Sequence, residues 1–452
     1  MLRVAGGSGN TGLWRIHPES GEMEAITEPN RAEREKGHRL PDALPGGKAI
    51  LFTATAIDIT SYDDGTIRVL DLETGEIETL IDGGRCARYS ASGHIVYFRE
   101  DTLFAAPFDA NALRLTGAPV PVQTGVTTAG WGGLFAIADN GTLVFAPGGP
   151  INPNRRVVWV DRQGHKEPLN FNAPSTGSLT HVTLSPDKDL LAVNIVGATD
   201  HIWIYDIARG SPMRLTFEWD NGFAAWAPHG GRIAFSSNRN GPWNLYMTTV
   251  GASGDAERLT TSPSGQRPGS WFPDGTTLIY DETHPETGED LWLLQLDGDR
   301  VPEPFLRTPF NEWNAHVSPD GRFVAYQSNE SGRYEVYIRA FEDSESKIQV
   351  STAGGIEPRW RPDGAEIFYR EQDRFMAVDV SLRDGALVLG RPVTLFEDDS
   401  IIGRSSFRQI PYDVSSDGFI AIDTTESEPP PTELELVLNW GEELKRLAPP
   451  TN

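Results

Sequence analysis

The side chains of this sequence best suited to chemistry are its histidines, its acidic residues and two Gly-Ser-Gly strings. GGSGN (6–10) and GASGD (251–255) approach the G-x-S-x-G of a serine hydrolase, but both lack its final glycine spacing. No pair among the nine histidines has the H-E-x-x-H spacing of a zinc peptidase. The single cysteine, Cys86, allows neither an internal disulfide nor a multi-cysteine metal site. We therefore expect no catalytic residue, no metal, no cofactor and no enzymatic activity.

Acidic side chains dominate the charge of the chain. The 452 residues include 64 Asp and Glu against 39 Lys and Arg, a net charge of −25 that repels phosphate backbones and disfavours a nucleic-acid partner. Clusters such as SYDDGT (61–66) and EDDS (397–400) lack the D-x-D-x-D-G pattern of a calcium loop. The start MLRVAGGSGNTGLW has no basic segment before an apolar run, and no apolar stretch reaches the length of a membrane helix. We expect neither a signal peptide nor direct membrane insertion.

The candidate binding residues are polar and aromatic side chains on or beside the innermost strand of a repeated unit. Alternate residues of such strands point into a central channel. A mixed-charge, aromatic-rimmed channel mouth suits a protein or peptide partner, or a polar small ligand. The alternative is that these polar groups only hold water and one another. The candidates are His181, Trp219, Asn221, Arg267, Trp313, Asn314, His316, Glu357, Arg359, Arg408 and Tyr412.

The repeated unit that positions these residues is a Pro-Asp-Gly-like turn followed by a short apolar strand. Nine copies run from LPGGKAILF (44–52), through FPDGTTLIY (272–280) and SPDGRFVAY (318–326), to SSDGFIAI (415–422). Their spacing averages about 46 residues, the length of one four-stranded propeller blade. A single blade exposes both faces, and stacking blades around a ring buries them. The sequence therefore predicts an all-β propeller, with Trp226, Trp271 and Trp360 packed between blades.

The number of rings is open from the sequence. APGGPINPNRR (146–156) is typical of a linker, which favours N-terminal propeller units over 1–150, as an incomplete ring, and a six-bladed ring over 151–452. That ring would close by joining RVVWVDRQG (156–164) to LELVLNW (434–440). The alternative is one closed ring of eight or nine blades.

Three segments carry a family resemblance: SPDGRFVAYQSNESGRYEVYIRAF (318–341), RLTTSPSGQRPGSWFPDGTTLIY (258–280) and LVLNWGEELKRL (436–447). They resemble the TolB-like, WD40-like propeller region of bacterial receptor-type serine/threonine protein kinases. The chain has no glycine-rich phosphate loop, HRD or DFG, so phosphoryl transfer is not expected. The resemblance implies a sensor or scaffold module on the extracytoplasmic side of a membrane.

Two functions are compatible with these patterns. The first is a non-catalytic binding or sensor module that recognises a protein or ligand at the channel mouth. The second is a metal-dependent, lactonase-like propeller hydrolase with a divalent ion in the channel. Glu357, Asn314 and Asp413 would have to supply that ion's ligands, and they are scattered among Thr, Ala, Arg and Pro.

Overall fold

The apolar runs after the Pro-Asp-Gly-like turns are strands, and most of them lie in antiparallel sheets of four. The computed structural model describes residues 3–6, 11–17, 19–57, 62–129, 132–148, 155–171, 178–252, 254–342, 346–383, 385–401, 410–424 and 432–450. The chain forms two compact units, unit 1 (Met1–Pro153, Gly197–Thr199 and Glu426–Asn452) and unit 2 (Asn154–Val196 and Asp200–Thr425). Residues 426–452 therefore belong to unit 1, whereas the predicted division assigned everything after 150 to one ring. Within the described ranges, no helix has the length and apolar character needed to cross a membrane.

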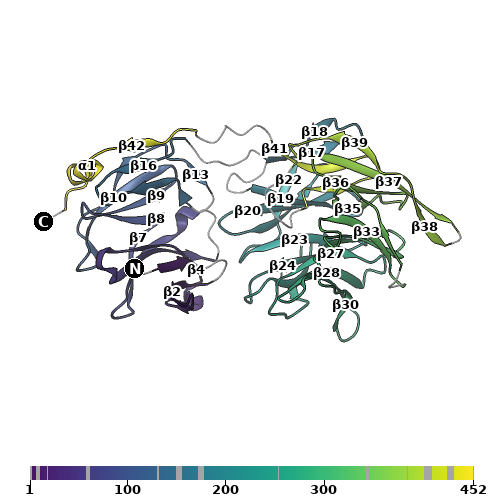
Figure 1. Ribbon diagram of the computed structural model, residues 1–452, viewed down its shortest axis with the longest axis horizontal. Coiled ribbons are helices and arrows are strands. Elements are labelled where there is room, and N and C mark those ends of the chain that lie inside the picture. The colour runs from purple at the N-terminus through teal and green to yellow at the C-terminus, as the bar shows by residue number, and fades with distance from the viewer. Residues whose placement is uncertain are drawn as a thin grey trace. The chain divides into compact units, whose positions relative to one another are not determined.

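Unit 2 contains six sheets, drawn from teal through green to yellow in Figure 1. Five sheets have four strands and one has five. The first sheet in chain order contains β19 (Ser178–Leu184), β20 (Leu190–Val196), β21 (His201–Asp206) and β22 (Ser211–Arg214), and the second contains β23 (Asn221–Trp226), β24 (Arg232–Ser237), β25 (Asn244–Thr249) and β26 (Glu257–Arg258). The third contains β27 (Gln266–Trp271), β28 (Thr277–His284), β29 (Gly288–Gln295) and β30 (Pro302–Leu306), and the fourth contains β31 (Glu312–Val317), β32 (Phe323–Ser328), β33 (Glu335–Ala340) and β34 (Lys347–Gln349). The fifth contains β35 (Ile356–Trp360), β36 (Glu366–Glu371), β37 (Arg374–Arg383), β38 (Ala386–Leu389) and β39 (Val393–Glu397).

The sixth sheet closes the ring with strands from both ends of unit 2. It consists of β40 (Tyr412–Val414), β41 (Phe419–Thr424), β17 (Arg155–Val160) and β18 (Lys166–Pro168). The first strands β19, β23, β27, β31, β35 and β40 contact one another in succession, and β40 returns to β19, so unit 2 is a six-bladed propeller.

The sequence correctly predicted that strands from both ends of the ring share one blade. The predicted partner of the strand at 156–164 was wrong. β17 pairs with β41, Val157 lying opposite Ile422, and not with residues 434–440. The physical reason is burial: β41 is buried from Phe419 to Asp423, as a middle strand must be, while Leu434, Leu436 and Leu438 are exposed.

Indole groups join neighbouring blades, as the sequence predicts. The Nε1 of Trp226 donates to the carbonyl oxygen of Thr183 at 3.2 Å, and Trp271 makes the same bond to Ala225 at 3.2 Å. Trp360 repeats it at 3.0 Å to the carbonyl oxygen of His316. Because all three rings are buried and bonded to the preceding blade, they hold the ring together.

The first strands β19, β23, β27, β31 and β35 share a feature that alternation alone does not predict, a β-bulge in the middle, whereas β40 pairs with β41 in an unbroken register. The pairing register shifts between Gly222 and Ala225 in β23, and the equivalent shifts in β31 and β35 flank Asn314 and Glu357. Phe223, Asn314 and Glu357 all have positive φ, between 53° and 58°. A bulge re-aims the side chains on either side of it, so the two halves of each strand serve different parts of the channel.

Unit 1 is also built from propeller-like sheets, in purple and blue with yellow C-terminal elements (Figure 1). Its sheets are β1 (Arg3–Gly6), β2 (Leu13–Ile16) and β3 (Met23–Ala25); β4 (Glu35–Ala43), β5 (Ala49–Ala56), β6 (Thr66–Asp71) and β7 (Ile77–Asp82); β8 (Arg85–Ser90), β9 (His94–Arg99), β10 (Thr102–Asp109), β11 (Arg114–Leu115) and β12 (Val120–Gln123); β13 (Thr128–Ala129) and β14 (Gly132–Gly133); and β15 (Phe135–Ile137), β16 (Leu143–Phe145) and β42 (Glu435–Val437). Short 3₁₀ turns occur at Arg31–Glu33, Pro45–Gly47 and Tyr62–Asp64. Helix α1 (Trp440–Leu447) buries Trp440 and Leu444 against this unit's core.

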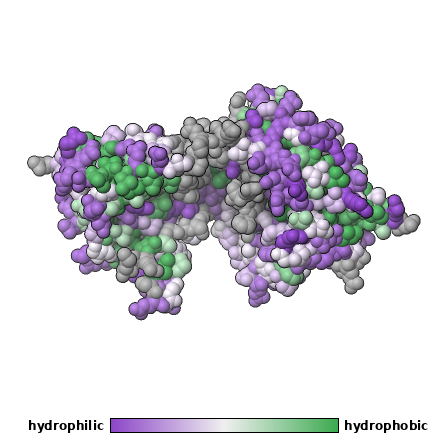
Figure 2. Space-filling view, turned by 45° about the horizontal axis from the view of Figure 1, so that its top comes forward, coloured by the Kyte–Doolittle hydropathy of each residue, from purple (hydrophilic) through white to green (hydrophobic). Residues whose placement is uncertain are grey.

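The visible surface is mainly hydrophilic, with smaller hydrophobic areas (Figure 2). This agrees with a chain in which 23% of residues are charged.

Candidate functional site

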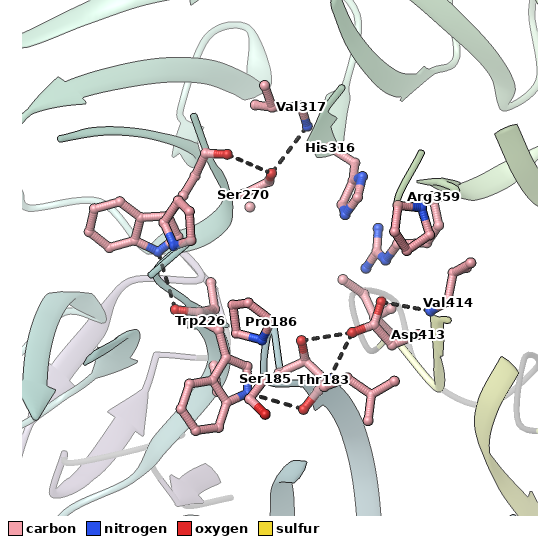
Figure 3. A pocket seen from close by; sticks show the side chains of 18 of the residues that line it. Thr183, Ser185, Pro186, Trp226, Ser270, His316, Val317, Arg359, Asp413 and Val414 are labelled. Carbon is pink, nitrogen blue, oxygen red and sulfur yellow. Dashed lines mark hydrogen bonds between the residues drawn. The ribbon is translucent and has the colours of Figure 1, made fainter. Parts of the chain in front are cut away.

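One cavity of unit 2 opens among the Pro-Asp-Gly-like turns, and we call it the turn-side cavity. It has a volume of about 430 Å³. Its wall contains the residue three positions before the turn proline, or its equivalent, from every blade of the ring. These six residues are Thr183, Ala225, Ser270, His316, Arg359 and Asp413. The cavity is therefore the end of the central channel, with one side chain contributed by each first strand (Figure 3).

The mouth of the turn-side cavity is rigid and largely apolar. Five turn prolines line it, one from each of five blades: Pro186, Pro228, Pro273, Pro319 and Pro362. In the sixth blade Ser416 stands at the proline position, where its hydroxyl accepts a hydrogen bond from Lys188 Nζ at 2.7 Å. A rim of prolines has few conformations to lose when a ligand binds, which lowers the entropic cost of recognition.

His316 presents a neutral imidazole to the cavity. Its Nδ1 accepts a hydrogen bond from the backbone N–H of Trp360 at 3.3 Å, which assigns the ring proton to Nε2. Burial, followed by the charge of Arg359, holds the pKa of His316 well below its usual range. The ring is therefore a hydrogen-bond donor at neutral pH and carries no charge.

Asp413 is the carboxylate of the cavity, and protein donors already occupy it. Oδ2 accepts from the Thr183 hydroxyl at 3.0 Å and the Leu184 N–H at 2.8 Å, and Oδ1 accepts from the Val414 N–H at 2.8 Å. These bonds tie β40 to β19 across the ring closure. Asp413 is thus engaged in holding the last blade to the first.

Besides Lys188, which bonds to Ser416, the cavity is lined by a second cation, Arg359. It is only 6% exposed, and Nη1 donates to the adjacent Pro358 carbonyl oxygen at 2.8 Å. Among the residues that the structure describes, no carboxylate lies within ion-pair distance of its guanidinium. Figure 3 shows the guanidinium and the His316 ring close together at the cavity wall.

A second cavity lies at the opposite end of β19, β23 and β27, and we call it the strand-start cavity. Its volume is about 340 Å³, and its lining includes Asn221, Phe223, Trp243 and Arg267. Here the cation is paired: Arg267 Nη1 lies 2.7 Å from Asp281 Oδ2, and its guanidinium lies over the ring of Phe223. Burial nevertheless raises the pKa of Asp281 to about 7. The charged groups of this cavity therefore satisfy one another.

His181 lines both cavities and is buried. Its Nε2 donates to the Ala224 carbonyl oxygen at 3.1 Å, and burial lowers its pKa to about 4. Its Nδ1 has no hydrogen-bond partner among the described residues. His181 is therefore a neutral group between the two ends of the channel.

The structure divides the predicted site residues into several groups. His316 and Arg359 line the turn-side cavity, Asn221 and Arg267 line the strand-start cavity, and His181 lines both. The remaining described candidates line neither cavity: Trp219, Trp313, Asn314, Glu357 and Tyr412. Arg408 lies outside the described residues.

Three of the residues outside the cavities have evident structural contacts. Trp313 is buried and packs edge-to-face on Tyr334, and the Tyr412 hydroxyl donates to the Glu357 carbonyl oxygen. The Glu357 carboxylate lies 3.6 Å from Arg370. Sequence reasoning missed the proline rim as part of the site, although the repeated turn prolines were a signal for it.

We also compared the acidic and histidine side chains of the described residues with the requirements of a metal cage. Among the described residues, no group of three or more His, Cys, Asp and Glu side chains is arranged to hold an ion. Of the three suggested metal ligands, Asp413 lines the turn-side cavity, whereas Asn314 and Glu357 do not. The donor set therefore does not fit the hydrolase alternative.

Comparisons with known proteins agree with this architecture. The family model of the TolB β-propeller domain (PD40) matches residues 160–386, half of the chain. An uncharacterized protein of Agrobacterium fabrum is 23% identical over 201 residues, which cover 41% of this chain and 67% of that protein. The Tol-Pal system protein TolB of Francisella tularensis is 24% identical over 231 residues, which cover 47% of this chain and 53% of TolB, so the match spans about half of that relative's length.

Two TolB structures are among the solved structures to which the chain is similar at low sequence identity. A putative TolB from Agrobacterium tumefaciens is 20% identical with a TM-score of 0.47, covering 60% of this chain and 99% of its own. TolB from Acinetobacter baumannii is 15% identical with a TM-score of 0.40, covering 76% of this chain and 80% of its own.

Proposed function

This chain belongs to the TolB-like PD40 β-propeller family, and from that premise we propose that it is a non-catalytic binding module whose ligand enters the turn-side cavity of unit 2. The ligand would be a peptide segment of a protein partner or a polar small molecule. A role as the sensor region of a bacterial serine/threonine kinase would be one setting for such a module.

One observation supports this proposal above the others: the turn-side cavity combines a rigid apolar rim with an unneutralised polar floor. Five prolines form the rim, and Arg359 and His316 offer donors at the floor. Binding sites are typically apolar concavities with a few well-placed polar groups. The strand-start cavity lacks this property because Arg267 is already paired with Asp281.

The proposal can be tested with peptide libraries and a filled cavity. The full chain would be screened against two libraries of random hexapeptides, one displayed with a free C-terminus and the other with a free N-terminus. Affinities of enriched peptides would then be measured by calorimetry for the wild type, for Ser270→Phe, which fills the cavity, and for Ser331→Phe. Ser331 is an exposed residue in the turn between β32 and β33 and serves as the matched control.

We expect enriched peptides to bind the wild type and Ser331→Phe equally and Ser270→Phe at least about tenfold more weakly, a loss of about 1.4 kcal/mol. If the peptides bind Ser270→Phe as tightly as the wild type, their binding site is not in this cavity. Metal analysis of the purified chain addresses the rival function, because a stoichiometric divalent ion together with hydrolysis of a lactone would favour the hydrolase.

A further inference from the structure

The guanidinium of Arg359 is buried, and no carboxylate of the described residues lies within ion-pair distance of it. An arginine side chain stays charged under all ordinary conditions, and burying an unpaired charge is costly. The nearby acids have closer partners than Arg359: Asp413 accepts three hydrogen bonds from other groups, and the Glu357 carboxylate lies 3.6 Å from Arg370, whose charge acts on its pKa more strongly than that of Arg359 does. Paired arginines in the same ring, such as Arg267 with Asp281, show that the fold can neutralise a channel cation. At Arg359 it does not, and the charge faces a cavity.

The groups around Arg359 add donors, which is the environment of an anion. His316 on the neighbouring first strand carries its proton on Nε2, because Nδ1 accepts from the Trp360 N–H at 3.3 Å. A planar guanidinium beside an imidazole N–H matches the two oxygens of a carboxylate, which arginine binds through two parallel hydrogen bonds.

The negative charge of Asp413 in the same cavity limits how much charge the anion can carry. Its three donors offset that charge in part, so a singly charged group is favoured over a doubly charged phosphate. The apolar rim of five prolines favours a group attached to a less polar body, since the body would lie against the rim.

We propose that Arg359 and His316 form a carboxylate-binding subsite at the floor of the turn-side cavity. This inference rests on the proposed function, because it names the chemistry of the ligand for the same site. The carboxylate can come from a free small molecule or from the C-terminus of a peptide, and the two sources share the contacts at Arg359.

The test follows the Arg359 side chain directly by NMR. The full chain would be labelled with ¹⁵N in arginine only, and the Nε–Hε signal of Arg359 would be assigned as the one lost in Arg359→Gln. The probes are sodium acetate, an N-acetylated tetra-alanine with a free C-terminus, the same peptide as its C-terminal amide, sodium phosphate, and sodium chloride at matched ionic strength.

We expect acetate and the free-acid peptide to shift the Arg359 signal, and the amide and chloride to leave it in place. A free-acid peptide that saturates at a concentration at least about tenfold below acetate identifies a chain terminus as the source. Equal saturation by both identifies a free small carboxylate. A signal unmoved by any carboxylate, or moved by phosphate and not by carboxylates, would overturn the subsite.

Substitutions of Arg359 distinguish a residue that binds the carboxylate from one that only stabilises the fold. Arg359→Gln should weaken binding of the free-acid peptide at least tenfold without lowering the unfolding temperature, because it removes an unpaired buried charge. Arg359→Lys keeps the charge but loses the two-pronged geometry, so its affinity should be intermediate. Arg209→Gln, which removes an exposed arginine outside the channel, is the matched control.

The outcomes of this test and of the library screen are distinguishable. Peptides that bind the turn-side cavity with an amidated C-terminus, and bind Arg359→Gln as well as the wild type, would refute the carboxylate subsite and leave the binding function intact. If the carboxylate-dependent shift persists in Ser270→Phe, the anion does not bind in the turn-side cavity. That result would refute both the carboxylate subsite and the proposed binding function of this cavity.

Discussion

Replacing Glu312 by glutamine should stabilise the protein at alkaline pH and have little effect at acidic pH. Glu312 begins β31 and is 1% exposed. Its Oε1 accepts hydrogen bonds from the Thr308 and Ser328 hydroxyls at 2.6 and 3.3 Å, while Oε2 has no partner among the described residues. Burial, reinforced by the charges of Asp290 and Glu330, raises the pKa of Glu312 to about 7.

The sign and size of the effect follow from this pKa. Because the pKa in the folded state is above the ordinary value of 4.5, the stabilising contribution is complete below about 4.5 and is lost as the pH rises through about 7. The difference between the two values corresponds to at most about 3 kcal/mol, since one pKa unit is about 1.4 kcal/mol. Glutamine keeps an acceptor oxygen for Thr308 and Ser328 and carries no charge at either extreme.

The assay is urea unfolding of the wild type and Glu312→Gln at about pH 5 and about pH 8. We expect the difference in unfolding free energy between the variant and the wild type to be about 1 to 3 kcal/mol more favourable to the variant at pH 8 than at pH 5. Glu303→Gln, at an exposed carboxylate on β30, should show no such pH dependence. A Glu312→Gln effect of equal size at both pH values, or a variant less stable than the wild type at about pH 8, would refute the reasoning.

Two further predictions concern single residues. Lys188 has a φ of 67° at a turn position where the equivalent residues Gly275 and Gly321 also have positive φ. Because a non-glycine residue is strained in this conformation, Lys188→Gly should raise the unfolding free energy by about 1 kcal/mol in urea denaturation. An unfolding free energy below that of the wild type would contradict the strain argument. Cys86 is buried and burial raises the pKa of its thiol, so it should not react with a disulfide reagent in the native chain and should react once urea unfolds it; rapid native labelling would contradict the burial.

The ring itself could be predicted from the sequence because the signal is repeated. Each turn is followed by a strand that must be buried on both faces, and a module of this length can bury them only by stacking on copies of itself. The tryptophans before the turns were placed correctly for the same reason. The partner of β17 was not, because the strands at 419–424 and 435–437 are both short and apolar, and only three-dimensional burial separates them.

The candidate site was predictable in part, and the bulges explain which part. Simple alternation assigns Glu357 and Arg359 to one face of β35, and the same argument joins Asn314 to His316 on β31. The structure places His316 and Arg359 on the turn-side cavity and leaves Asn314 and Glu357 outside both cavities. Nothing in the identity of a glutamate or a phenylalanine indicates positive φ, which such residues seldom adopt.

The way in which both units are completed has a consequence for the chain as it leaves the ribosome. The sixth blade of unit 2 is incomplete until β40 and β41 have been synthesised, and the sheet of β15 and β16 in unit 1 is incomplete until β42 has been synthesised. Until about residue 440 has emerged, the nascent polypeptide must carry unpaired edges of β16 and β17, the kind of surface that associates with other chains. Translation arrested just short of this point should therefore yield a product that is captured by chaperones or aggregates, although nearly all of its blades are already made.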